Sequence, residues 1–174
     1  MKPPPASGSA PGIVQGPRGQ SNGVRRARLI TGLVLFTFVT THLTNHSLGL
    51  ISLATMESGR WLFLALWRSA PGAAVLQGSL LIHVALALWS IYLRRHFRMP
   101  LWEALQLGLG LVIPVILVDH AVNTVRAHEQ YGFDDSYTMI VLLFWKVRPD
   151  IGAWQALLLV IAWTHGCIGI HFWL

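Results

Sequence analysis

Apolar residues gather in four long stretches of this chain, at about residues 29–53, 73–93, 101–123 and 151–174. A helix rises about 1.5 Å per residue, and the hydrocarbon core of a bilayer is about 30 Å thick, so about 20 helical residues are enough to cross it. Each of the four stretches reaches that length. The pattern therefore predicts four transmembrane helices.

Two shorter apolar segments lie between these stretches. Residues 57–72 carry aromatic and leucine side chains interrupted by Arg60 and Arg68, and residues 139–147 are too few to cross a bilayer. Segments of this length and charge are typical of helices that lie in the membrane interface. The predicted fold class is an all-α polytopic membrane bundle, with four main transmembrane helices and short interfacial helices.

The two ends of the chain bear on domain organisation, each in its own way. Residues 1–24 are rich in Pro, Gly and Ser, and such a segment cannot bury enough apolar surface to fold. We expect a disordered cytoplasmic tail there, followed by one membrane domain over residues 25–174. The sequence stops at Leu174 directly after an apolar stretch. We therefore expect it to be a truncated piece of a longer protein.

Composition supports a membrane protein, since 53% of the residues are hydrophobic and only 11% are charged. Cys167 is the single cysteine, which excludes an internal disulfide and any four-cysteine iron–sulfur or zinc site within this chain. The formal net charge is +6. The basic residues sit at the ends of the predicted helices, as membrane topology requires, so we expect no nucleic-acid partner.

Arginines mark the connections that face the cytoplasm, because positive charge is retained on that side of a membrane. One group precedes the first apolar stretch and a second fills the connection between the second and third stretches. These groups are Arg25, Arg26, Arg28 and Arg94, Arg95, Arg98. The pattern predicts a multi-pass membrane protein with a cytoplasmic N-terminus, and the family resemblance given below implies that the membrane is the bacterial inner membrane.

Every predicted membrane helix carries a histidine, which is a costly residue in a lipid environment. A rise of about 1.5 Å per residue converts sequence position into depth. On that scale His46, or His42, lies with His120 at an outer level, and His83 lies with His165 at an inner level. A bundle that sets the first helix against the third, and the second against the fourth, would pair these imidazoles at two depths.

Paired imidazoles on facing membrane helices are the ligands of a non-covalently held b-type haem. The pattern therefore predicts haem b, in two copies stacked across the membrane. The predicted iron ligands are His46, His83, His120 and His165. His42 lies four residues from His46 on the same helix face, so either imidazole could reach the same iron. Arg126 could pair with a haem propionate at the outer edge.

Other residues in and near the predicted helices have simpler explanations. His96 and His128 fall in connections and His171 near the inner boundary, where solvent satisfies an imidazole. Any single membrane histidine is as often a hydrogen-bonding group as a metal ligand. Glycines within or beside the helices allow either ordinary helix packing or close approach of a flat macrocycle. These glycines are Gly49, Gly78, Gly108, Gly110, Gly166 and Gly169.

Three segments resemble one family in particular: Thr41 to Gly49 (THLTNHSLG), His83 to Tyr92 (HVALALWSIY), and Ile113-Pro114 followed by Asp119-His120. They are similar to the succinate dehydrogenase/fumarate reductase cytochrome-b-like membrane anchor found at the N-terminus of some bacterial class III adenylate cyclases. The resemblance covers residues 25–174. It implies that the histidines named above bind b haems, and that the helices lead into a cytoplasmic domain that makes cyclic AMP.

Three functions follow as hypotheses, none with a catalytic site in this chain. The first is a haem-b-binding membrane anchor that acts as redox sensor and electron-transfer module of an adenylate cyclase, with a homodimer implied by the resemblance. The alternative is a cytochrome b membrane subunit of a quinone-linked succinate or fumarate oxidoreductase, whose partners are quinone and separate redox subunits. A small transporter with histidines as proton relays is the third, and it predicts no haem.

Overall fold

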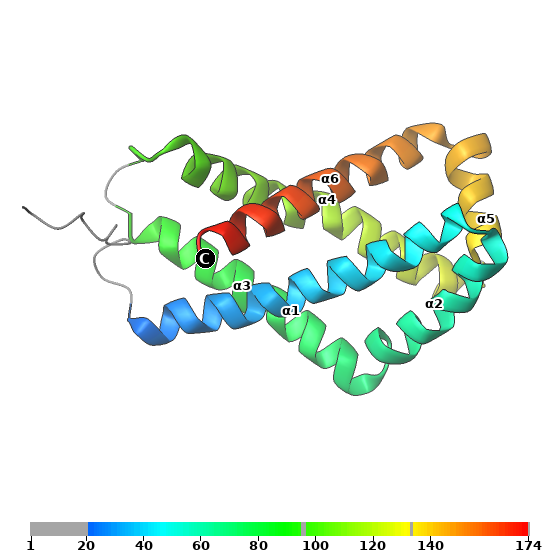
Figure 1. Cartoon of the computed structure of the whole chain (residues 1–174), viewed down its shortest axis with the longest axis horizontal. Coiled ribbons are helices and arrows are strands. Elements are labelled where there is room, and N and C mark those ends of the chain that lie inside the picture. Colours follow the sequence, from blue (N-terminus) through cyan, green and yellow to red (C-terminus); the bar gives the residue numbers. More distant parts are fainter. Residues whose placement is uncertain (1–20, 95–96, 133, 174) are drawn as a thin grey trace, which may run out of the picture.

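The computed structural model describes residues 21–94, 97–132 and 134–173, and these residues form helices joined by short connections, with no strand among them. The side chains of Asp119, residues 123–129 and Tyr131 also lie outside this description, as does the predicted tail over residues 1–20. The elements in chain order (Figure 1) are α1 (Asn22–Ser47), the 3-10 turn η1 (Leu48–Leu50), α2 (Leu53–Trp67), α3 (Ala70–Tyr92), α4 (Leu101–Tyr131), α5 (Tyr137–Leu142), the π-helical turn η2 (Leu143–Val147) and α6 (Pro149–His171).

Four of these helical segments are long and apolar enough to cross a membrane, and they coincide with the four predicted stretches. The predicted fold class is therefore confirmed. The segments are Asn22–Leu50, Ala70–Tyr92, Leu101–Val122 and Pro149–His171. Large apolar side chains such as Leu81 and Val115 are exposed on their outer faces. Such a surface suits contact with lipid.

Helix ends extend beyond the apolar stretches that predicted them. α1 begins at Asn22 rather than at residue 29, because the side chain of Ser21 caps it by accepting a hydrogen bond from the Val24 amide at 3.4 Å. The tail boundary predicted at residue 24 therefore falls inside this helix. α4 continues to Tyr131 and stops at Gly132, whose φ of 58° lies in the left-handed region that ends helices.

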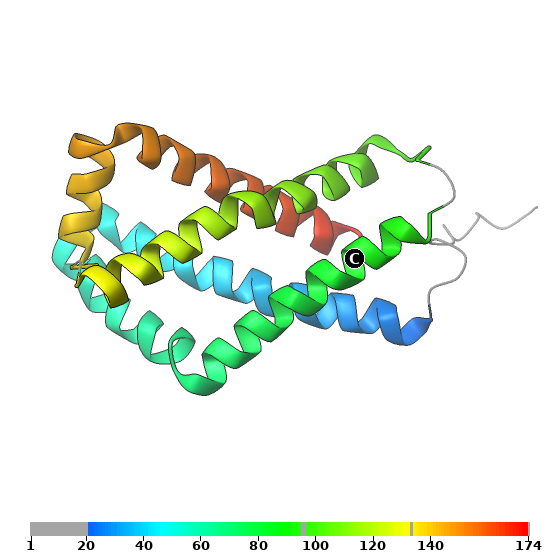
Figure 2. The same ribbon diagram turned by 180° about the vertical axis from the view of Figure 1, so that it is seen from behind.

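The transmembrane helices α1 and α3 pack together, as do α4 and α6, and α1 also contacts α6. The members of the first two pairs are joined through α2 and through the α5–η2 segment. The arrangement set out from the sequence, with the first transmembrane helix against the third and the second against the fourth, does not occur as extensive helix packing among the described residues. The four helices form a curved row in the order α3, α1, α6, α4 (Figures 1 and 2). Within the described residues α3 and α4 share no extensive contact, so the row has an open side.

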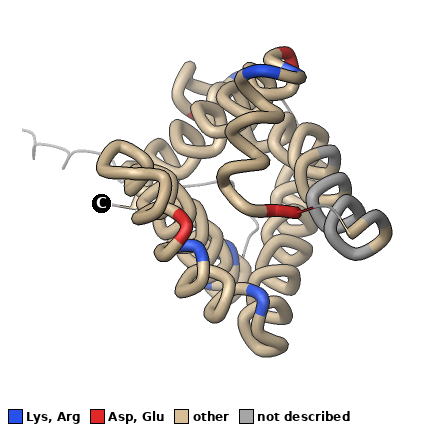
Figure 3. Tube along the Cα trace, turned by 90° about the vertical axis from the view of Figure 1, so that its right-hand side faces the viewer, with Lys and Arg blue, Asp and Glu red and all other residues tan. Residues whose placement is uncertain are grey.

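α2 and the α5–η2 segment close the end of the bundle opposite the α1 start. Figure 3 views this end and shows its acidic and basic residues. Asp135 forms ion pairs with Arg60 and Arg68, each at 3.0 Å, and Arg60 also pairs with Glu57. The second oxygen of Glu57 accepts a hydrogen bond from the Tyr137 amide at 2.8 Å. These contacts join α2 to the segment that begins α5.

Candidate functional site

His83 of α3 and His165 of α6 meet in the interior of the bundle. Their ring centres lie 6.4 Å apart and their planes are at 90° to each other. Both side chains are shielded by the neighbouring helices, and each has intermediate exposure. The two helices face each other across the curved row. The structure thus brings together the two residues of the predicted inner level, although their helices are not direct neighbours.

The hydrogen bond made by His165 determines which of its ring nitrogens carries a proton. Nδ1 of His165 lies 3.1 Å from the backbone carbonyl oxygen of Gln106 on α4. A carbonyl oxygen can only accept, so Nδ1 is the donor. In the neutral ring the lone pair is then on Nε2, the nitrogen that this contact does not use.

The same reasoning applies to His83, whose Nδ1 lies 3.2 Å from Oγ1 of Thr31 on α1. The Thr31 hydroxyl has one hydrogen, which it shares between the backbone carbonyl oxygens of Ala27 at 2.8 Å and Arg28 at 3.2 Å. The hydroxyl must therefore accept from the imidazole, which places the proton on Nδ1. His83, like His165, keeps its lone pair on Nε2.

Two glycines make room for these rings. A Cβ atom at Gly110 would lie 2.8 Å from Cε1 of His165, and a Cβ atom at Gly32 would lie 3.1 Å from Cε1 of His83. The first distance is shorter than carbon atoms tolerate, and the second is tight. Each imidazole therefore occupies space that the absent side chain of a glycine on the neighbouring helix leaves open.

The other glycines singled out in the sequence are mostly packing positions. A Cβ atom at Gly166 would collide with the Phe36 ring, and one at Gly169 would lie 3.0 Å from the Gln106 side chain. Gly49 lies against the Met56 sulfur. Gly78 and Gly108 have open space around the position of a Cβ atom. Of the glycines named from the sequence, Gly110 is the one whose neighbour is a predicted ligand.

The distance between the two inner rings is compatible with a metal ion whose other ligands belong to a cofactor. Metal-ligating histidines commonly donate their second ring nitrogen to a carbonyl or other acceptor, as both rings do here. A metal–nitrogen bond is about 2 Å long, so two imidazoles on opposite sides of one metal have ring centres roughly 6 Å apart. No cluster of three or more metal-binding side chains occurs among the described residues. Two imidazoles are what an iron porphyrin requires of its protein.

A second histidine group lies in the outer half, where α1 faces α4. His42 and His46 are joined through their Nε2 atoms at 3.1 Å, with ring centres 4.4 Å apart. His120 of α4 interacts electrostatically with both rings. The three histidines of the predicted outer level therefore gather in one place. Their geometry differs from that of the inner pair, because one Nε2 atom must donate to the other.

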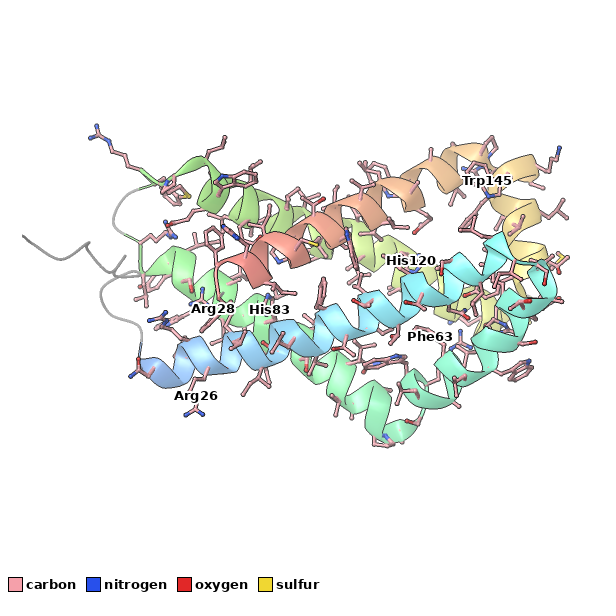
Figure 4. The ribbon with its side chains drawn as sticks, viewed as in Figure 1. Arg26, Arg28, Phe63, His83, His120 and Trp145 are labelled. Carbon is pink, nitrogen blue, oxygen red and sulfur yellow. The ribbon has the colours of Figure 1, made fainter. Side chains whose placement is uncertain are left out.

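The surroundings of His42 and His46 are different. His42 packs against the rings of Phe38 and Phe63 at 5.7 and 5.2 Å, and its Nδ1 is buried without a hydrogen-bond partner among the described residues. His46 instead contacts the ring of Tyr137 at 5.3 Å. Figure 4 labels Phe63 and His120 at this level. His42 is thus the more enclosed ring, and His46 lies closer to the covering helix α5.

Tyr137 links this group to the cover of the bundle, which consists of α2 and the α5–η2 segment. Its hydroxyl accepts a hydrogen bond from Nδ2 of the buried Asn45 at 2.5 Å. Nearby, the Trp67 indole donates to Oγ1 of Thr41 at 3.1 Å, which ties α2 to α1. Burial raises the pKa of the Tyr137 hydroxyl above its ordinary value, because the phenolate form is poorly solvated there. The outer histidines therefore lie beneath a cover that is joined to α1 by two side-chain hydrogen bonds.

No family model, curated protein or solved structure matches this chain. The resemblance drawn from the sequence therefore remains a prediction, and the geometry of the two histidine groups carries the functional argument.

Five other residues considered in the sequence add little to these groups. The side chains of Arg126, Asp119 and His128 lie outside the described residues, as does the whole of His96, so the predicted pairing of Arg126 with a propionate has no geometry to support it. His171 is exposed, as expected, and lines a surface pocket of about 350 Å³ with Trp102, Cys167 and Ile168. It takes no part in either histidine group.

Sequence reasoning missed the residues that orient the inner rings. Thr31 and Gln106 are polar residues within apolar stretches. A polar residue in such a place is the sequence signal that could have pointed to them. Gln106 acts through its backbone, which no residue type reveals. Gly32 was overlooked because its importance depends on which face of α1 meets α3.

Proposed function

We propose that this chain is a haem-b-binding membrane anchor that serves as redox sensor and electron-transfer module of an adenylate cyclase. The observation that carries the proposal is the inner pair: two imidazoles on facing helices, 6.4 Å apart between ring centres, each with Nδ1 engaged and Nε2 bearing the lone pair. When bound, haem b supplies a one-electron redox couple inside the membrane.

The protein residues have distinct tasks in this proposal. His83 and His165 would hold the haem iron through their Nε2 atoms. Thr31 and the Gln106 carbonyl hold the two rings in one tautomer and one orientation, which also increases the basicity of Nε2. Gly32 and Gly110 provide the space that each ring occupies. The lipid-exposed helices keep bulk water from the site.

A second haem at the outer level is part of the proposal, with His120 and either His46 or His42 as ligands. This site requires one change that the inner site does not require. The hydrogen bond between the Nε2 atoms of His42 and His46 must open before either nitrogen can bind iron. Tyr137, beside His46, could retain the displaced ring in contact with the cover of the bundle.

The link to a cyclase rests on the sequence resemblance, and the inner pair would serve a cytochrome b subunit of a quinone-linked oxidoreductase equally well. The two functions differ in what the redox state controls. If the anchor is a sensor, cyclase activity of the intact parent protein differs between reduced and oxidised samples. Identical rates in both states would contradict the sensing function and leave electron transfer.

Haem binding itself is tested on the purified chain in detergent. We expect b-type haem by the pyridine haemochrome assay and a reduced-minus-oxidised spectrum with two haems per chain. His83→Ala and His120→Ala should each remove about half of the haem, whereas His171→Ala, at an exposed histidine, should remove none. A chain that takes up no haem on reconstitution would refute the proposal and favour a proton-relay transporter, for which the direct His42–His46 hydrogen bond is suited.

A further inference from the structure

Arg28 lies beside the inner histidine pair, one helical turn before Thr31. Its backbone carbonyl oxygen accepts a hydrogen bond from the Thr31 hydroxyl at 3.2 Å, and that hydroxyl in turn contacts Nδ1 of His83. The Arg28 side chain interacts electrostatically with the His83 ring. Its neighbour Arg26 points away from the bundle (Figure 4) and is exposed, whereas Arg28 is half-buried.

Two other guanidinium groups contribute to the electrostatic surroundings of the half-buried Arg28. Arg25 and Arg94 both interact repulsively with it. Arg94 forms an ion pair with Glu103 at 3.2 Å. Glu103 is the acidic residue at this end of the bundle among those whose side chains the structure describes. A half-buried guanidinium next to two other guanidiniums loses hydration and gains repulsion, so an additional anionic group at this position would stabilise the fold.

We infer that Arg28 binds a carboxylate of the group held between His83 and His165. This inference rests on the proposed function, because it takes the group to be haem b, whose two propionates are its only anionic substituents. A guanidinium matches a carboxylate with two parallel hydrogen bonds, which fixes orientation as well as adding affinity. Arg28 would thus determine which edge of the porphyrin faces the arginine-rich end of the bundle.

The position of Arg28 favours a ligand inside the bundle over the phosphate of an anionic lipid. Arg28 lies on the part of α1 from which Thr31 reaches α3 and His83. A lipid headgroup approaching from the bilayer would meet the exposed side chains of Arg25 and Arg26 first. The half-buried position of Arg28 is therefore better suited to a carboxylate that belongs to an interior ligand.

The test compares haem b with haem b dimethyl ester, in which both carboxylates are esterified and uncharged. The full chain is titrated with each porphyrin in nanodiscs, and binding is followed by the absorbance of the bis-imidazole form. We expect Arg28→Gln to weaken haem b binding about tenfold to a hundredfold, as for loss of a charge-assisted hydrogen bond. The same variant should bind the ester as the wild type does, and the matched control Arg26→Gln should behave as the wild type with both.

Each contrary result points to a different error. An equal loss with haem b and with the ester would show that Arg28 supports the scaffold rather than a carboxylate. Binding of both porphyrins by Arg28→Gln at wild-type affinity would overturn the inference. If that variant also lost copurified phosphatidylglycerol, the anion bound by Arg28 would be a lipid phosphate. Failure of the wild type to bind either porphyrin would refute the proposed function itself. Retained ester binding by Arg28→Gln, together with an unchanged helical spectrum, excludes misfolding as the cause.

Discussion

The hydrogen bonds at His83 and His165 fix both the protonation and the direction of each ring. Nδ1 of His165 is held by a backbone carbonyl, and Nδ1 of His83 by a hydroxyl that is itself anchored to the helix backbone. A ligand at Nε2 therefore meets rings that already have the required tautomer. Preorganisation of this kind reduces the ordering cost of binding.

The contact between Gly110 and the His165 ring gives a prediction with an internal control. Gly110→Ala places a methyl group 2.8 Å from Cε1 of His165 and must displace the imidazole. We expect haem affinity to fall about tenfold to a hundredfold, the usual effect of disturbing the support of a metal ligand. Gly108→Ala, two residues away, meets open space and should leave haem content unchanged. Equal haem content in the two variants would mean that Gly110 does not position the ring.

Depth along the sequence predicted the partners His83 and His165, because an axial rise of fixed size converts residue number into height in the membrane. The same method could not separate His42 from His46, which share a helix face. Their mutual hydrogen bond depends on side-chain rotamers, which sequence position does not determine. The supporting contacts of Thr31 and Gly32 depended on helix rotation, which was also unknown.

At the scale of elements, α2 is held to the rest of the molecule by charges with little solvent exposure. Asp135 bridges Arg60 and Arg68, and the side chains of Asp135 and Arg60 are 14% and 13% exposed. Such partly buried pairs are screened less than surface pairs. They join α2 to the segment that precedes α5, and so they hold together the two parts of the cover that lies over the outer histidines.

Loss of this bridge should destabilise the cover. Asp135→Asn leaves two guanidiniums without that carboxylate, and we expect the free energy of unfolding to fall by about 1.5–3 kcal/mol. Asp150→Asn breaks a solvent-screened, exposed pair with Arg148 and should change the free energy of unfolding much less than Asp135→Asn does. Unfolding of the detergent-solubilised chain, followed by circular dichroism, measures both. An Asp135→Asn effect no larger than that of Asp150→Asn would show that the bridge does not stabilise the fold.

Tyr137 makes the docking of α5 sensitive to alkaline pH. Its hydroxyl has a raised pKa in the folded chain because burial disfavours the phenolate. The neutral form is thus favoured by folding, so this contribution to stability is complete below the unfolded pKa, about 10, and is lost as the pH rises through the folded value. A tyrosinate absorbance titration of the wild type minus Tyr137→Phe should show one group that ionises above that range. A difference curve centred at or below pH 10 would contradict this.

Element type and number could be predicted from hydrophobic stretches, but element ends and neighbours could not. The capped start of α1 at Ser21 and the extension of α4 to Tyr131 lie in polar sequence, which the apolar pattern does not cover. The order of helices in the bundle depends on which helix faces meet, since α3 and α4 are joined by the shortest connection between transmembrane helices and yet share no extensive contact among the described residues. That information is three-dimensional, so the predicted pairing of alternate helices was wrong as packing and correct for the inner histidines.

The whole molecule is electrically asymmetric. The start of α1, which carries Arg25, Arg26 and Arg28, lies together with the ends of α3 and α6 and the start of α4, and α2 and α5 lie at the opposite end (Figure 1). Arg25 stacks over the Trp173 ring at 5.7 Å, which joins the start of α1 to the residues that follow α6. The positive-inside rule predicts that this end faces the cytoplasm.

This orientation can be measured with single cysteines in a Cys167→Ser background. Asn22 and Thr138 are both exposed and lie at opposite ends of the bundle. We expect a membrane-impermeant thiol reagent to label Thr138→Cys in intact inner-membrane spheroplasts, and to label Asn22→Cys only after the membrane is permeabilised. The reverse pattern would invert the orientation, and labelling of both from outside would contradict a bundle that spans the membrane.

Within the described residues α3 and α4 share no extensive contact, which bears on how the proposed haem would reach its site. A bundle closed on all sides would have to form around the haem, whereas a row with an open edge can fold first and take up the haem afterwards. Because haem is flat and largely apolar, it would reach that edge by lateral diffusion in the bilayer. In the proposed anchor, membrane insertion of the helices would therefore precede loading of the cofactor.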